Sequence, residues 1–171
     1  MKNFTQNFIR LLALVFSMSF TVNAQEIGEI YEGGYIFKIN ENGTGLVADL
    51  QDLGEMNWYD ATSLSASATS QGYDDWYLPS IDELVEMFNT IGNGGSEGNI
   101  GGFENTWYWS SSETTWDDAS LYLFDYGYLV SAGMSQSYRV RIIRAVTFAV
   151  EDVMGCTDPM AMNYDPMATM D

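Results

Sequence analysis

The residues that could do chemistry in this chain are aromatic and acidic, and they gather between positions 107 and 128. Seven Trp and Tyr side chains fall within these 22 residues, together with two adjacent aspartates. A flat aromatic ring can stack on the apolar face of a sugar while neighbouring polar atoms bind the sugar hydroxyls. We therefore predict a binding surface for an extracellular glycan or protein, made of Trp107, Trp109, Trp116, Asp117, Asp118, Tyr126 and Tyr128.

Packing in the core is the competing interpretation of each aromatic residue. Trp107 and Trp109 fall on one face of a predicted strand and Tyr108 on the other, because successive strand residues point to opposite faces. Trp116 lies in a predicted loop, where core packing is harder to achieve, so the run from Trp116 to Asp118 is the strongest candidate. Burial of all five tryptophans would contradict sugar stacking.

The composition excludes most catalytic sites. The chain has no histidine and a single cysteine, so Ser-His-Asp and Cys-His arrangements and the common zinc sites cannot form. A carboxylate-based glycan hydrolase needs two acids at a set distance, and the adjacent pairs Asp74–Asp75 and Asp117–Asp118 are more simply explained as solvated loop acids. We predict that the protein is not an enzyme.

The first 24 residues have the pattern of a signal peptide. Lys2 and Arg10 precede an apolar run over 11–20, and Val22-Asn23-Ala24 offers small residues for cleavage. The apolar run is too short to span a bilayer, which takes roughly 20 residues. We expect cleavage after Ala24, no membrane insertion afterwards, and a secreted or cell-surface location.

The chain after Ala24 is strongly acidic. It keeps all 24 Asp and Glu residues but only four of the six basic residues, a formal charge of −20. Such a surface repels phosphate backbones, sulfated glycans and anionic lipids, so a nucleic-acid partner is not expected. The basic residues gather near the end, where Arg139 and Arg141 share a strand face, and we expect ion pairing for Arg141 and Arg144.

Hydrophobic periodicity and turn residues predict an α+β domain over residues 25–150 with an antiparallel sheet. The stronger of two helices follows Ser80, which forms a capping box with Glu83, and Gly92 ends it. The predicted elements are a hairpin over 34–49, helices over 57–69 and 80–91, and strands over 107–112, 120–124 and 138–150, with a hairpin tip at 125–128.

Several of these segments together resemble one family. The motifs are Gly33-Gly34-Tyr-Ile-Phe, Asp75-Trp-Tyr-Leu-Pro-Ser-Ile-Asp-Glu-Leu84, Tyr108-Trp-Ser-Ser-Ser-Glu113 and Val140-Arg-Ile-Ile-Arg-Ala-Val146. They resemble the Lcl C-terminal-domain family, also called DUF1566. The resemblance implies a C-type lectin-like fold, in which two helices flank a small antiparallel sheet and the terminal strands pair, here 34–39 with 141–146. Characterised members resemble adhesins for polyanionic glycans, but four basic residues leave this chain without a basic groove.

Residues 151–171 are predicted to be a linker and a short repeat. The motif Gly-Cys-Thr-Asp-Pro-x-Ala-x-Asn-Tyr-Asp-Pro resembles a repeat of Bacteroidetes surface proteins that continues with Asp-Gly-Ser-Cys, so we expect this copy to be truncated. Its oxygen donors suit calcium. The predicted ligands are Asp158, Asn163, Asp165 and Asp171.

These observations favour an exported binding or adhesion module. The signal peptide and the tail repeat fit a structural surface module without a small ligand equally well. An exposed aromatic surface near the 114–119 loop would favour binding.

Overall fold

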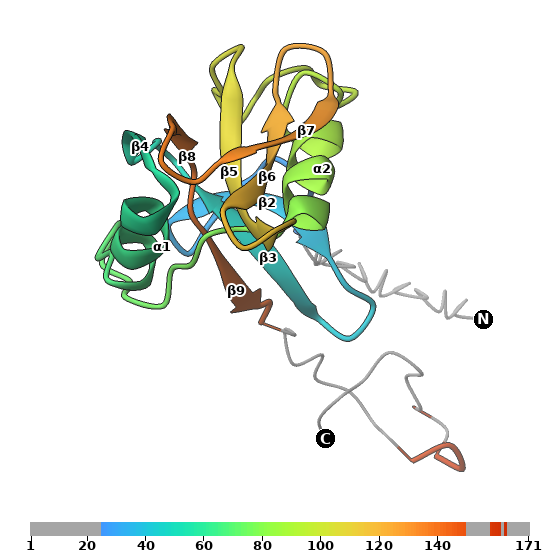
Figure 1. Cartoon of the computed structure of the whole chain (residues 1–171). Coiled ribbons are helices and arrows are strands. Elements are labelled where there is room, and N and C mark those ends of the chain that lie inside the picture. Colours follow the sequence, from blue (N-terminus) through green and yellow to red (C-terminus); the bar gives the residue numbers. More distant parts are fainter. Residues whose placement is uncertain (1–24, 150–157, 162, 164–171) are drawn as a thin grey trace, which may run out of the picture.

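A computed structural model describes residues 25–149, 158–161 and 163. Residues 25–149 form an α+β domain with two helices and two sheets (Figure 1). The predicted signal peptide and most of the predicted tail repeat lie outside the described residues. The elements are β1 (Ile30–Tyr31), β2 (Gly34–Ile39), β3 (Thr44–Asp49), β4 (Gly54–Asn57), α1 (Trp58–Ala66), α2 (Ile81–Thr90), β5 (Trp107–Glu113), β6 (Asp118–Leu123), β7 (Tyr128–Gly133), β8 (Ser137–Val140) and β9 (Ile143–Thr147).

The first sheet has the order β1, β2, β3, β9. Its β2–β3 hairpin confirms the prediction over 34–49, with Gly43 at a φ of +78° donating its N–H to the Asn40 carbonyl. The predicted pairing of residues 34–39 with 141–146 is wrong, because β1 and β3 occupy the two edges of β2. The last strand, β9, pairs instead with the free edge of β3.

The second sheet has the order β4, β8, β5, β6, β7 and is mixed, because β5 and β8 run parallel where Tyr108 meets Arg139. The single predicted strand over 138–150 is also wrong. β8 ends at Val140 and β9 begins at Ile143, so the chain passes from one sheet to the other at Arg141, whose side chain turns into a buried polar network. The outer strand β7 was not expected from the sequence.

Both helices begin at side-chain caps. The Ser80 hydroxyl accepts the Glu83 N–H (3.3 Å) and the Glu83 carboxylate accepts the Ser80 N–H (2.7 Å), which confirms the predicted capping box of α2. The apolar side of α2 packs against β2, β5 and β6, with Leu84 and Met87 fully buried. Neither helix of the described part has the length and hydrophobicity needed to cross a membrane.

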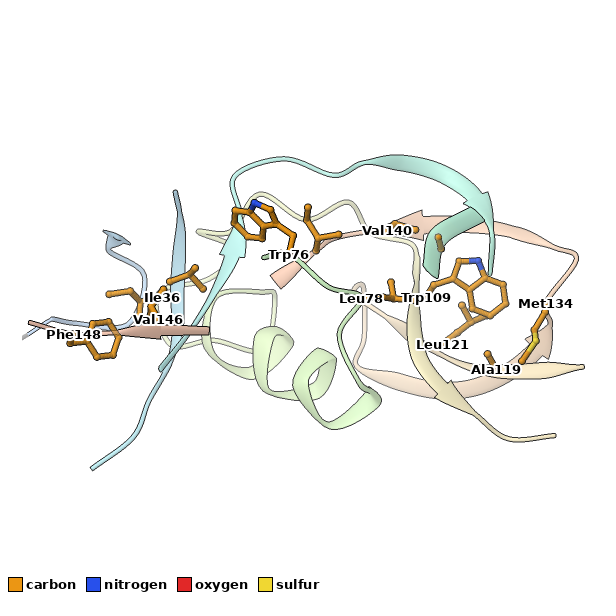
Figure 2. Close-up of a cluster of buried hydrophobic side chains, with 13 residues drawn as sticks. Ile36, Trp76, Leu78, Trp109, Ala119, Leu121, Met134, Val140, Val146 and Phe148 are labelled. Atoms are coloured by element: carbon orange, nitrogen blue, oxygen red, sulfur yellow. The ribbon is translucent and has the colours of Figure 1, made fainter. Parts of the chain in front are cut away.

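Two clusters of buried side chains hold the sheets together, and each draws residues from both sheets. The first joins Ile36 and Val146 of the first sheet to Trp109 and Leu121 of the second (Figure 2). The second cluster, against α2, joins Phe37 to Tyr108 and Phe124. The two sheets therefore share one hydrophobic interior rather than folding as separate units.

Candidate ligand-binding surface

The turn between β5 and β6 carries Trp116 and is closed by hydrogen bonds. The N–H groups of Thr114 and Thr115 donate to the Asp118 carbonyl (2.9 and 3.2 Å). The Thr115 hydroxyl accepts the N–H groups of Asp117 and Asp118 (3.4 and 3.1 Å). These bonds order the backbone on both sides of Trp116, so a ligand that binds here has little loop entropy to remove.

The turn is also attached to the neighbouring elements. The Met134 N–H donates to the Asp117 carbonyl (2.8 Å), and the Met134 carbonyl accepts the N–H of Trp58 at the start of α1 (3.0 Å). The Met134 side chain is buried beside Ala119 in the first cluster (Figure 2). The β5–β6 turn, the β7–β8 turn and the start of α1 therefore form one ordered end of the second sheet.

Trp116 is 89% exposed at this end, and the adjacent Asp117 is also exposed. Asp118 is half-buried at the first position of β6. The structure thus brings together three of the predicted residues, and it leaves the Trp116 indole in water on an ordered backbone.

The other predicted aromatic residues of β5 belong to the core. Trp109 is fully buried, and its indole N–H donates to the Met56 carbonyl (3.0 Å), so the side chain is satisfied without a ligand. Trp107 is half-buried and packs against the same cluster. The prediction of Trp109 as a ligand residue is corrected here, because a fully buried ring has no face to offer.

Tyr126 and Tyr128 are exposed (81% and 63%) but lie at the β6–β7 hairpin, at the opposite end of β6 from Trp116. Six residues of antiparallel strand span about 20 Å. The predicted surface is therefore divided, and Trp116 does not share a site with these tyrosines.

A polar notch beside the turn adds Gln136, which was not predicted. A Cβ at Gly133 would lie 3.7 Å from Gln136 Nε2 and 3.8 Å from Asp118 Oδ1, so the missing side chain leaves room between an amide donor and a carboxylate acceptor. The Tyr138 hydroxyl donates to Gln136 Oε1 (2.8 Å) and so directs Nε2 away from itself. No local sequence signal marks Gln136, because it is the pairing of Asp118 with Gly133 that brings the β7–β8 turn, and Gln136 with it, beside Asp118. We call Glu113, Trp116, Asp117, Asp118 and Gln136 the Trp116 surface.

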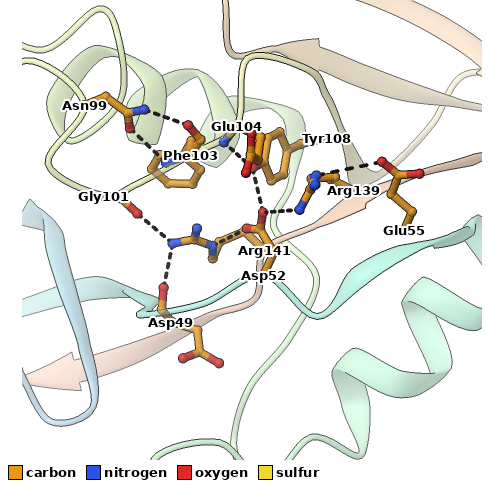
Figure 3. A network of polar contacts seen from close by, with 10 residues as sticks. All are labelled: Asp49, Asp52, Glu55, Asn99, Gly101, Phe103, Glu104, Tyr108, Arg139 and Arg141. Carbon is orange, nitrogen blue, oxygen red and sulfur yellow. Dashed lines mark hydrogen bonds and ion pairs between the residues drawn. The ribbon is translucent and has the colours of Figure 1, made fainter.

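A second polar cluster surrounds the Asp52 carboxylate (Figure 3). Arg141 Nε donates to Asp52 Oδ1 (2.6 Å), and the Tyr108 hydroxyl donates to Oδ2 (2.8 Å). Arg141 also donates to the carbonyls of Asp49 and Gly101 (2.8 and 2.9 Å). Burial, together with the Asp52 charge, raises the pKa of Tyr108, so its hydroxyl remains a donor. Arg141 is only 2% exposed, so this cluster joins loops and strands and does not present a surface to a ligand.

The basic residues of the described part are all held in ion pairs, which confirms the expectation for Arg141 and Arg144. The pairs include Lys38–Glu86 (2.8 Å), Arg139–Asp52 (3.4 Å), Arg141–Asp52 (2.6 Å) and Arg144–Asp75 (2.6 Å). Arg139 and Arg141 both pair with Asp52, although Arg141 lies between β8 and β9 and not on the strand face that the sequence predicted. None of these partners belongs to the Trp116 surface.

The other candidate binding sites are a metal site and a shallow pocket. Within residues 25–149, 158–161 and 163, no group of three or more acids, cysteines or histidines could hold a metal ion. Of the predicted calcium ligands, Asp158 and Asn163 are exposed, whereas Asp165 and Asp171 lie outside the described residues. A shallow pocket of about 350 Å³ near the end of α1 is lined by Leu53, Leu64 and residues 67–70, and carries no charged side chain.

The structure is an α+β domain with an exposed aromatic turn at one end of its larger sheet, and its sequence matches a known family. The model of the Lcl C-terminal domain family matches residues 38–144, which contain α2, the Trp116 surface and the Asp52 cluster, so the chain is a member of that family. None of the curated proteins compared with the chain matches it.

Proposed function

We propose that this protein is an exported, non-enzymatic surface module that binds an extracellular glycan through the Trp116 surface. The observation that carries the proposal is the 89% exposure of Trp116 on a hydrogen-bonded turn. The indole offers a stacking face, and the Asp118 carboxylate and Gln136 amide offer an acceptor and a donor for hydroxyl groups. The signal-peptide pattern of residues 1–24 supports export, and the acidic composition argues against a nucleic-acid partner.

A C-type lectin-like fold, a role in binding rather than catalysis, and calcium binding by the tail are parts of the same proposal. Two helices packed on twisted sheets support a C-type lectin-like arrangement, in which loops at one end of a sheet carry ligand contacts. The absence of histidine supports binding rather than catalysis. Oxygen donors in residues 158–171 support calcium binding by the tail.

A glycan array, run with and without calcium, tests the proposal and provides a ligand for titration. We expect Trp116→Ala to weaken binding of that ligand at least tenfold by calorimetry, because a central Trp contributes most of the energy of a small interface. Tyr126→Ala is the matched control, since Tyr126 is similarly exposed at the far end of β6. Unchanged affinity in Trp116→Ala, or loss in Tyr126→Ala alone, would contradict the assignment.

A structural surface module is the second candidate, and β7 favours it. This outer strand of the second sheet has no charged residue, and Tyr128 and Leu129 are exposed (63% and 51%). Uncharged edge strands are prone to pair with other chains. If no glycan on the array binds, with or without calcium, the structural surface module becomes the favoured function.

A further inference from the structure

The charge on the Trp116 surface is of one sign. Glu113 and Asp117 are exposed and Asp118 is half-buried, so three carboxylates occur within the six residues 113–118 that include Trp116. The Lys and Arg side chains of the described part are all engaged with acids elsewhere, and Arg139, the nearest along the chain to Gln136, contacts Asp52 and Glu55. No described basic side chain therefore neutralises this end of the sheet.

The chemistry of these groups selects a cation. The face of an indole attracts a positive charge, and carboxylates accept hydrogen bonds from an ammonium group. An anionic sugar would be repelled by the same three carboxylates. An inorganic cation is a poorer match, because no group of three acids in the described residues converges on one point.

On the basis of the proposed glycan binding, we infer that the ligand of the Trp116 surface is an amino sugar whose free amine is protonated. The sugar ring stacks on Trp116, and the ammonium group is bound by Asp117 and Asp118. A hydroxyl oxygen of the sugar accepts a hydrogen bond from the Gln136 amide. A single exposed aromatic side chain and a small notch match one sugar ring. A protein partner would need a surface of about 800 Å².

Three hexasaccharides that differ only at one substituent test this inference, namely β-1,4-linked glucosamine, N-acetylglucosamine and glucose. Calorimetry at low salt should show that the glucosamine oligomer binds at least tenfold more tightly than the other two, and that added salt reduces the difference. Trp116→Ala should abolish binding of all three. The double variant Asp117→Asn with Asp118→Asn should remove the preference for the amine, so that the three oligomers bind this variant with affinities within about twofold of one another.

A matched control separates local from overall charge. Glu41→Gln with Glu97→Gln removes the same charge from two exposed positions in other loops and should keep the preference. An equal loss in this control would overturn the inference, as would Trp116-independent binding of oligolysine. Equal affinity for all three oligomers would overturn the amine preference and leave glycan binding intact, whereas no binding of any oligomer to the wild-type protein would overturn both.

Discussion

At the scale of single residues, Trp109 and Trp116 show how position decides what a side chain does. Trp109 is fully buried and donates its indole N–H to a backbone carbonyl, so it contributes packing and one satisfied hydrogen bond. Trp116, seven residues later, extends into water from a turn that cannot bury it. Burial of an indole stabilises the fold through the apolar area removed from water, whereas an exposed indole contributes little until a ligand covers it.

Asp75 provides a residue-scale prediction about pH. The hydrogen bonds from Arg144 (2.6 and 3.0 Å) hold the pKa of Asp75 below its usual range. The stabilisation is therefore present above the unfolded pKa of about 3.9 and is lost as the pH falls through the lower folded pKa. Asp75→Asn should lower the free energy of unfolding by at most about 1 kcal/mol at neutral pH, because the side chain is half-exposed.

Urea unfolding at several pH values measures this contribution. The difference between wild type and Asp75→Asn should shrink toward zero in strong acid. Arg144 also contacts Glu32 and stacks 3.8 Å from the Tyr73 ring, so it is a poorer choice for substitution than Asp75. A difference that stays constant from neutral pH to pH 2 would contradict the assigned role of the charge.

At the scale of elements, the start of α2 is determined by nearby residues, because the capping box of Ser80 and Glu83 that the sequence predicts is present in the structure. Ser80→Ala removes the acceptor for the Glu83 N–H and should lower the free energy of unfolding by about 1 kcal/mol, measured by urea denaturation. Ser80→Thr keeps a hydroxyl at the cap and should recover most of the loss. If threonine were as harmful as alanine, packing of Ser80 rather than capping would be responsible.

The boundaries of the last strands are not predicted by local sequence patterns. Residues 138–150 have the β-branched composition of one long strand, but the chain leaves the second sheet after Val140 and joins β3 from Ile143. At this break, Arg141 is held by Asp52 and by the carbonyls of Asp49 and Gly101. These partners are 40 to 92 positions away in the chain, so no local pattern can reveal them.

At the scale of the whole molecule, the two sheets share both hydrophobic clusters, so neither sheet can lose its packing alone. We expect one cooperative unfolding transition, in which far-UV circular dichroism of the backbone and tryptophan fluorescence give the same midpoint in urea. Trp116→Phe should leave the fluorescence midpoint unchanged, because the remaining tryptophans report on the interior. Two separated midpoints would show that the sheets unfold independently.

The sequence alone determined the family, the α+β class, the capped helix, the first hairpin and the run from Trp116 to Asp118 as the best candidate site. Each of these depends on a motif or on residues close together in the chain. Only the tertiary structure decided that β3 separates β2 from β9 and that Trp109 is buried in the core. It also decided that Tyr126 lies far from Trp116 and that Gln136 lies beside Asp118. The physical reason is that strand pairing and burial are set by contacts between distant segments, which a local pattern does not specify.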